Sequence, residues 1–266
     1  MSTFPRRSNL TQTLFRKLFA TCGALVLALS ATLLPVGHAQ AEGKTFSFAM
    51  TGLYPPFSYR DGSKLEGFDA DIGRALAAQM GMKAEPVAQP WQTLIAALKA
   101  NRFDAIIGSM AITPKRLEAV NFSDPYYKSG AQVFISANNK NLHSVDDLHG
   151  KTVGVLVSST FEATAKKYTS HIKTYTDDVT ALHDLTVPGR LDAVITDELV
   201  GSNAIMKAHL AVKRLGAPLD LDNIGIAVNK DNPELLKRIN EALAAIKANG
   251  KYAEVSKRYF GRDISK

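Results

Sequence analysis

Apolar residues recur along the chain at two spacings, one typical of helices and one typical of strands. In residues 69–80, Ile72, Leu76 and Met80 repeat every four positions, which predicts a helix that ends at Gly81. Residues 45–50 alternate between polar and apolar, as a half-buried strand does. The same criteria predict strands at 45–50, 83–88, 105–107, 132–136, 151–157, 172–175, 191–195 and 223–229, a short pairing element at 64–68, and helices or helical turns at 69–80, 90–98, 113–116, 144–148, 161–168, 178–187, 197–209, 233–249 and 252–259.

These elements alternate, and one segment is repeated. Alternating strands and helices indicate an α/β fold with a parallel-type sheet and helices on both faces. Residues 101–108 (NRFDAIIG) are echoed by 189–196 (GRLDAVIT), and each copy follows a predicted helix and ends in an apolar strand. Chance similarity over so short a segment is the alternative; if the echo is structural, the chain has two similar lobes.

A candidate site follows the first copy. Residues 105–107 read as a buried strand, the pair 108–109 is expected to turn the chain, and Thr113-Pro114 is expected to cap and begin a helix. Arg116 then lies just beyond the C-terminal end of a strand, where ligands bind in open α/β sheets. A guanidinium beside free backbone N–H groups can hold a carboxylate, although Arg116 could instead be an ordinary surface arginine.

Four further residues complete a receptor for a zwitterion. Thr160, at a predicted helix start, can hold the same carboxylate from the other lobe, and Asp197, after the second copy, can accept from an ammonium group. Tyr54 and Trp91 offer flat walls for a side chain. Each also has an ordinary structural reading: Thr160 and Asp197 as helix caps, Trp91 as a core residue in phase with its helix, and Tyr54 as part of a proline-stiffened loop.

The first 41 residues are predicted to be a secretory signal peptide. A basic start with Arg6, Arg7, Arg16 and Lys17 precedes an apolar, small-residue core, with cleavage expected after Ala39 or Ala41. This leader carries four positive residues and no acids, so its removal lowers the formal charge from +7 to +3 (7 minus 4). The 225 residues that remain (266 minus 41) suffice for two lobes.

Composition excludes several classes of function. The single cysteine, Cys22, lies in the leader, so the mature chain has no disulfide and no thiolate metal site. Its histidines show no paired metal spacing, and it has no phosphate-binding loop, no nucleophile elbow and no basic run that would indicate nucleic acid. We expect no metal and no cofactor.

Several motifs together resemble the bacterial extracellular solute-binding proteins of family 3, which serve polar amino-acid ABC importers. The resemblance covers residues 44–264. It rests on Tyr54-Pro-Pro-Phe57, Gly67-Phe-Asp-Ala-Asp-Ile72, 91–99, 103–116, Val120-Asn-Phe-Ser-Asp-Pro-Tyr126, Leu148-His-Gly-Lys-Thr-Val-Gly-Val155, Gly189-Arg-Leu-Asp-Ala193 and Lys257-Arg-Tyr-Phe-Gly261.

The resemblance implies a type II periplasmic-binding-protein fold, with two α/β lobes joined by two crossing hinge strands that close on the ligand. It implies lobe 1 at 42–131 and 223–266, lobe 2 at 132–222, a periplasmic monomer, and an ABC permease as partner. By position, the ligand-binding residues are Tyr54, Trp91, Gly108, Ser109, Ala111, Arg116, Thr160 and Asp197. Of these, Ala111 (through its N–H), Arg116 and Thr160 would hold the α-carboxylate, and Asp197 the α-ammonium.

Departures from the family pattern bear on the ligand. Thr51 stands where binders of cationic amino acids often have Asp, and Leu156 and Val157 stand where some relatives have Lys or Gln. A charged ligand side chain then lacks an obvious partner, and a buried unpaired charge is costly. We therefore expect an uncharged or weakly polar amino acid, or one resembling cystine.

One enzymatic alternative stays open on the same scaffold. Some family relatives resemble cyclohexadienyl dehydratases, which need a carboxylic acid placed over a prephenate-like ring, and Glu162 and Glu198 flank the predicted cleft. Asp197 favours the binding protein, because prephenate carries no ammonium group. A sensor module of a membrane kinase is disfavoured, since no membrane-spanning segment follows residue 266 in this sequence.

Overall fold

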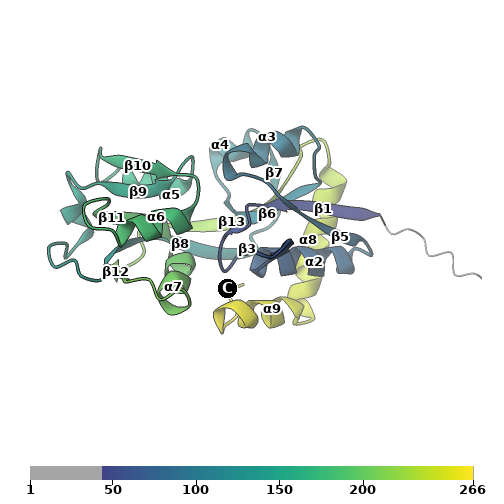
Figure 1. Cartoon of the computed structure of the whole chain (residues 1–266). Helices are drawn as coiled ribbons and strands as arrows, with labels where there is room; N and C mark the ends of the chain where they lie inside the picture. Colours follow the sequence, from purple (N-terminus) through teal and green to yellow (C-terminus); the bar gives the residue numbers. More distant parts are fainter. Residues whose placement is uncertain (1–43, 266) are drawn as a thin grey trace, which may run out of the picture. The chain divides into compact units, whose positions relative to one another are not determined.

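The computed structural model describes residues 44–265 as a mixed α/β fold (Figure 1), and the predicted signal peptide lies outside these residues. The strands are β1 (Thr45–Met50), β2 (Leu53–Tyr54), β3 (Ser58–Asp61), β4 (Lys64–Glu66), β5 (Lys83–Ala88), β6 (Ala105–Ala111), β7 (Asn121–Phe122), β8 (Tyr127–Ser136), β9 (Val153–Leu156), β10 (Ile172–Tyr175), β11 (Ala193–Asp197), β12 (Val212–Leu215) and β13 (Leu221–Val228). The α-helices are α2 (Phe68–Gln79), α3 (Leu94–Lys99), α4 (Pro114–Leu117), α5 (Thr160–Ala165), α6 (Asp178–Leu185), α7 (Glu198–Met206), α8 (Pro233–Ala248) and α9 (Lys251–Phe260), with 3₁₀ turns η1 (Trp91–Thr93) and η2 (Val145–Leu148).

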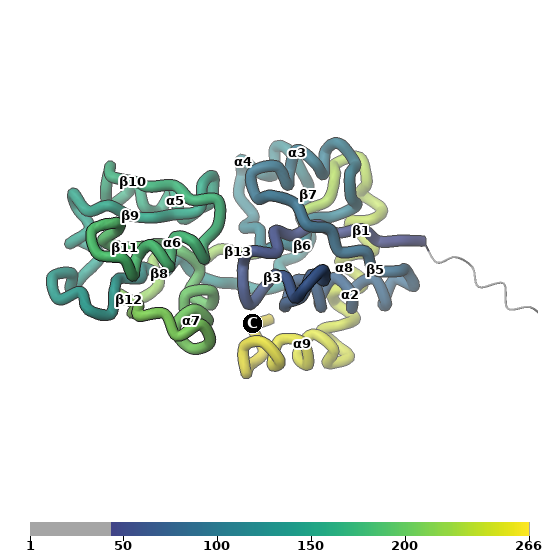
Figure 2. Tube along the Cα trace, viewed as in Figure 1, coloured from purple at the N-terminus to yellow at the C-terminus, as the bar shows by residue number. Residues whose placement is uncertain are grey.

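The strands form two lobes joined by β8 and β13. The sheet order is β10-β9-β11-β8-β13-β6-β1-β5, with β12 on β8 and β7 on β13. Residues 127–130 of β8 pair with β13, whereas residues 131–136 pair with β11 and β12. The tube in Figure 2 lets the reader follow both strands between the two groups of elements. Two strands therefore cross between the lobes, as the family resemblance implied.

The sequence echo marks a repeated structural device. In one lobe, Asp104 precedes β6 and its Oδ2 accepts from the backbone N–H of Ser47 in β1 at 2.7 Å. In the other, Asp192 precedes β11 and its Oδ2 accepts from the backbone N–H of Thr152, just before β9, at 2.8 Å. Each aspartate thus ties the start of one strand to its parallel neighbour. The echo is structural rather than a chance similarity.

Most predicted elements are present, with adjusted ends. The predictions for β1, β5 and β10 match the observed bounds. Strands β2, β3, β7 and β12, which have two to four residues each, were not predicted. Strand β8 begins at Tyr127 rather than at residue 132, since the polar residues at its start conceal the pairing with β13.

The prediction that residues 108–109 turn the chain is wrong. Strand β6 continues through both residues to Ala111. The chain accommodates them with a local irregularity instead: Ser109 adopts a left-handed φ of 55°, and the pairing with β13 shifts register between Gly225 and Ala227. The prediction that follows from it still holds, because Thr113 caps α4 by accepting from the N–H of Arg116 at 3.2 Å.

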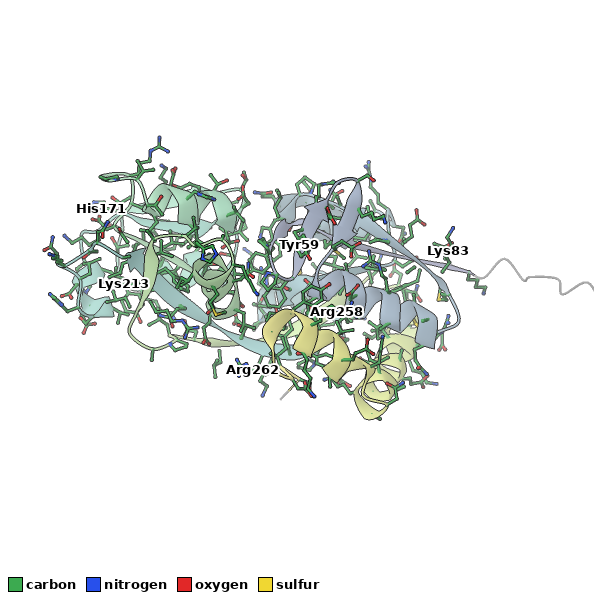
Figure 3. The ribbon with its side chains drawn as sticks, turned by 60° about the horizontal axis from the view of Figure 1, so that its bottom comes forward. Tyr59, Lys83, His171, Lys213, Arg258 and Arg262 are labelled. Carbon is green, nitrogen blue, oxygen red and sulfur yellow. The ribbon has the colours of Figure 1, made fainter. Side chains whose placement is uncertain are left out.

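The last helix, α9, packs against α2 through a polar contact and shared apolar residues. Figure 3 shows Arg258 on this helix, where its Nη1 lies 2.7 Å from Asp71 Oδ2, and the Tyr259 hydroxyl donates to the same oxygen at 2.8 Å. Phe68 of α2 meets the ring of Phe260 edge-on at 5.2 Å. None of the helices in residues 44–265 has the length and apolar character that crossing a membrane requires.

Helix α7 packs closely on β8, and this contact is testable. A Cβ at Gly201 would lie 1.9 Å from the ring of the fully buried Phe134. We expect Gly201→Ala to lower the melting temperature, because overpacking costs about 1–3 kcal/mol and outweighs a gain in helix propensity of up to about 1 kcal/mol. Thermal denaturation should show no comparable loss for Met206→Ala, an exposed position of the same helix. An unchanged melting temperature for Gly201→Ala would show that Phe134 moves aside freely.

Candidate functional site

A cavity of about 360 Å³ lies between elements of the two lobes. Elements on both sides contribute, including the ends of β6 and β11 and the starts of α5 and α6. All eight residues predicted from the sequence line it: Tyr54, Trp91, Gly108, Ser109, Ala111, Arg116, Thr160 and Asp197. The structure therefore brings them to one place, while their role in holding a ligand stays a prediction.

Arg116 is held in this cavity by contacts from both lobes. Its Nη1 donates to the carbonyl of Ala111 at 2.8 Å, and its Nη2 donates to the carbonyl of Ser158 in the other lobe at 3.4 Å. The guanidinium carbon lies 5.2 Å from the centre of the Trp91 ring. Burial lowers the pKa of Arg116, and the nearby Asp222 carboxylate opposes that shift. The guanidinium is thus oriented but only partly neutralised.

Ser109 is presented to the cavity by a buried network. Its hydroxyl donates to Asp69 Oδ2 at 2.8 Å, and its N–H donates to the Tyr126 hydroxyl at 3.0 Å. Tyr126 in turn donates to Asp69 Oδ1 at 2.7 Å. Because the only hydroxyl hydrogen of Ser109 is engaged by Asp69, its oxygen offers lone pairs rather than a donor to a ligand. This suits an ammonium group.

Asp197 is both a helix cap and a residue of the cavity wall, the two alternatives that the sequence left open. It is the N-cap of α7, with Oδ1 accepting from the N–H groups of Leu199 at 2.7 Å and Val200 at 3.4 Å, and it also lines the cavity. Burial raises the pKa of its carboxyl to about 6, while the hydrogen bonds from those two N–H groups oppose the shift. The cap and the cavity wall are therefore the same residue, and neither reading excludes the other.

Thr160 lines the cavity, but it does not cap its helix as one reading proposed. The N-cap of α5 is Ser159, whose hydroxyl oxygen accepts from the N–H of Glu162 at 3.2 Å. Thr160 is the first helical residue, and its hydroxyl donates to Asp222 Oδ2 at 2.7 Å. In this structure the hydroxyl predicted to hold a carboxylate therefore already holds one from the chain itself.

The two aromatic residues that were predicted to form walls of the cavity are half-buried, and each contacts another side chain of the protein. Tyr54 stacks on Phe57 with ring centres 5.6 Å apart, and Trp91 faces Arg116. Burial raises the pKa of the Tyr54 hydroxyl, and the carboxylates of Asp197, Asp178 and Asp69 raise it further, so this hydroxyl faces an acidic group of residues. Both aromatic residues also pack against a hydrophobic core, so Trp91 has a core contact as well as a place in the cavity wall.

Several residues of the cavity wall were not predicted from the sequence. Asp177, Asp178 and Asp222 line the cavity, so the premise that a charged ligand side chain has no partner here is wrong. Asp177 and Asp178 follow β10 at its C-terminal end, a position that already signalled Arg116 and Asp197, and could have been found by the same rule. Asp222 lies in the crossing strand β13, where no sequence pattern marks it.

Glu162 and Glu198 are not part of the cavity lining, contrary to the expectation that they flank the cleft. Glu162 accepts from the Ser158 N–H at 2.8 Å and pairs with Lys166 at 2.6 Å, and Glu198 pairs with Arg214 at 3.2 Å. Among the residues that the structure describes, no cluster of three or more histidine, cysteine or acidic side chains could hold a metal ion.

The raised pKa values of three buried carboxyl groups allow us to predict how the stability of the folded protein depends on pH. Burial is the main cause that raises the pKa of Asp69 and Asp178 to about 7 and that of Asp197 to about 6. Between the ordinary value of 3.8 and these values the folded state binds more protons than the unfolded chain, so stability falls as pH rises through this window. We expect the ligand-free protein to melt at a higher temperature near pH 5.5 than near pH 7.5.

Replacing Asp178 by Asn should reduce this difference, because one of the three carboxyls is removed. Differential scanning calorimetry at the two pH values measures both quantities. The expectation is contradicted if the melting temperature rises between pH 5.5 and 7.5.

Comparisons with known proteins agree with this geometry. The family model for "Bacterial extracellular solute-binding proteins, family 3" matches residues 46–262. The L-cystine-binding protein TcyJ of Escherichia coli is 32% identical over 229 residues, covering 85% of this chain and 86% of that protein. The L-arginine-binding protein of Pseudomonas aeruginosa is 36% identical over 262 residues, covering 93% and 98%.

A solved structure extends the likeness to three dimensions. The ancestral amino acid-binding protein AncCDT-1, a precursor of cyclohexadienyl dehydratase, superposes with a TM-score of 0.74 at 33% identity, covering 81% of this chain and 95% of that one. The family match spans nearly all of the described residues, and the two-lobed fold and the cavity are those that the sequence resemblance implied. The chain therefore belongs to the bacterial extracellular solute-binding proteins of family 3.

Proposed function

We propose that this protein captures a free amino acid between its two lobes and delivers it to an ABC importer. One observation carries the proposal: Arg116, which follows β6 in one lobe, and Asp197, which ends β11 in the other, line the same cavity. A guanidinium and a carboxylate from opposite lobes match the two ends of an α-amino acid. Both named relatives bind amino acids, which supports the same class of ligand.

We assign the site residues the roles that the family resemblance implies, and their place in the cavity wall supports this assignment. Arg116, with the N–H of Ala111 and Thr160, holds the α-carboxylate, and Asp197 holds the α-ammonium together with the lone pairs of Ser109. For Thr160 this requires its hydroxyl to leave Asp222 or to share its hydrogen bond. Tyr54 and Trp91 cover the side chain, and the backbone at Gly108 supplies a further polar contact.

Capture is proposed to proceed by closure of lobe 1 (42–131 and 223–266) on lobe 2 (132–222). The boundary at 131/132 is supported by the change of partners along β8, which pairs with β13 up to residue 130 and with β11 from residue 131. Bending at two strands leaves each lobe's own sheet intact, which is the usual requirement for hinge closure. We propose further that the chain is exported through its leader to the periplasm and acts there as a monomer.

The dehydratase alternative has weaker support. Its candidate acids, Glu162 and Glu198, are engaged in ion pairs and are not in the cavity lining. Four aspartates of the wall would also repel a dicarboxylate such as prephenate. A turnover assay with prephenate and arogenate separates the two functions, because a binding protein forms no product. Product formation at a rate above background would overturn the proposal.

Replacing Arg116 tests the carboxylate clamp. We expect Arg116→Ala to weaken binding of the preferred amino acid at least tenfold, because a charge-assisted contact worth about 1.5–3 kcal/mol is lost. A thermal-shift screen over the amino acids identifies the ligand, and isothermal titration calorimetry measures its affinity. Arg102→Ala, an exposed arginine away from the cavity, is the matched control. Equal affinities of Arg116→Ala and the parent protein would show that Arg116 does not hold the carboxylate of the ligand.

Replacing Asp197 by Asn tests the ammonium contact without deleting the helix cap. The Asn oxygen can still accept from the N–H groups of Leu199 and Val200, so the fold should survive. We expect at least a tenfold loss of affinity for the amino acid, because the charge that faces the ammonium is gone. Asp231→Asn, at an exposed position, is the control. Retained affinity by calorimetry would assign the ammonium contact elsewhere.

A further inference from the structure

One buried carboxylate in the cavity wall is only half satisfied. Asp178, the first residue of α6, is 1% exposed and lines the cavity. Its Oδ1 accepts from the Thr196 hydroxyl at 2.6 Å, whereas its Oδ2 has no hydrogen-bond partner among residues 44–265. An ionised carboxylate oxygen that is buried without a donor is costly, so in its ionised form Asp178 requires a donor that residues 44–265 do not supply.

Among the four wall aspartates, which all lie in the described residues, only Asp178 has a buried carboxylate oxygen without a hydrogen-bond partner. Asp177 accepts from the Thr180 N–H at 2.7 Å, Asp197 accepts from two helix N–H groups, and Asp222 accepts from the Thr160 hydroxyl. The ordinary structural explanation of an acid at a helix start, capping the free N–H groups, is taken by Asp177 in α6. Capping therefore does not account for Asp178.

The charge of the wall points to the sign of the missing group. Of the cavity-lining residues in the described part of the chain, four are aspartates (Asp177, Asp178, Asp197 and Asp222) and two are arginines (Arg60 and Arg116). The formal balance is therefore −2 (2 minus 4). A zwitterionic amino acid adds no net charge and leaves this excess, whereas an amino acid with a cationic side chain reduces it to −1. An uncharged N–H donor could satisfy Asp178 Oδ2 but would not reduce the excess.

We propose that Asp178 is a further ligand-binding residue that pairs with a positively charged group on the side chain of the captured amino acid. The preferred ligand is then an amino acid with a second cationic nitrogen: an ammonium, amidinium or guanidinium. This inference rests on the proposed capture of an amino acid and specifies which kind. It replaces the expectation of an uncharged ligand, which relied on the absence of a carboxylate at Thr51, Leu156 and Val157.

The surroundings of Asp178 fit this role. Its neighbour Thr196 precedes Asp197 in β11, so the two carboxylates lie at one end of the cavity wall but on separate elements. Helix α6 contacts β2, which carries Tyr54. The carboxylates of Asp178 and Asp197 both raise the pKa of the Tyr54 hydroxyl. Burial raises the pKa of the Asp178 carboxyl, so a ligand cation would also favour its ionised form. Two carboxylates can thus receive two nitrogens, one from the α-ammonium and one from the side chain.

Matched ligand pairs test the proposal. Isothermal titration calorimetry on the mature protein would compare arginine with citrulline and lysine with norleucine, which differ in side-chain charge at nearly constant size. We expect the cationic member of each pair to bind at least tenfold more tightly. In Asp178→Asn, whose side-chain oxygen can still accept from Thr196, we expect the arginine-to-citrulline affinity ratio to fall at least tenfold. Asp178→Ser serves if the Asn variant does not fold, as judged by its melting temperature.

The outcomes separate this inference from the function on which it rests. An unchanged arginine-to-citrulline ratio in Asp178→Asn overturns the inference, and so does an equal loss for both ligands, which would place Asp178 at the α-ammonium. No preference for cations in the parent protein also overturns it. If instead citrulline or norleucine binds tightly and Arg116→Ala abolishes that binding, the proposed function stands without the inference. If no amino acid binds, the proposed function fails and the inference fails with it.

Discussion

The structure of the site depends on one constraint: a charge withdrawn from water must be matched by a partner of opposite charge or by hydrogen-bond donors. Asp69 satisfies this with the hydroxyls of Ser109 and Tyr126, and Asp197 with the first N–H groups of α7. Arg116 satisfies it with two carbonyls and the face of Trp91. These partners fix the direction of each functional group before a ligand arrives, and this preorganisation lowers the entropy lost on binding.

The same constraint explains why the site lies where it does. Asp104 and Asp192 each tie a strand start to its parallel neighbour, so β6 with β1 and β11 with β9 form corresponding pairs in the two lobes. Arg116 follows the C-terminal end of β6 in one lobe, and Asp197 is the last residue of β11 in the other. Corresponding strand ends in two similar lobes therefore lie close to groups of opposite charge, and a two-ended ligand can bridge them. The crossing strands β8 and β13 bring the two ends to one cavity.

Much of this could be predicted from the sequence, and the failures have physical causes. The echo predicted two similar lobes because Asp104 and Asp192 stand in matching local sequences. The prediction of a turn at Ser109 was wrong because this residue, with its left-handed φ, is held in β6 by a hydrogen bond to Asp69. Asp69 is 40 residues away, so a local sequence pattern does not reveal the contact. The aspartates Asp178 and Asp222 were missed because only the packing of α6 and the crossing of β13 brings them to the cavity. Local sequence predicted the elements, whereas distant contacts decided the chemistry of the wall.

The asymmetry of the cavity also determines how a ligand is oriented. The guanidinium of Arg116 lies near Asp222, which already occupies the hydroxyl of Thr160, so an incoming carboxylate meets one attractive and one repulsive charge. At Asp197 and Asp178 an incoming ammonium meets only acceptors, including the lone pairs of Ser109. By formal charge, the wall therefore offers more acidic groups to the cationic end of a ligand than basic groups to its carboxylate. If the cavity holds an amino acid as proposed, selectivity should arise from the number and position of its cationic groups, while a carboxylate contact with Arg116 would fix the orientation that all amino acids share.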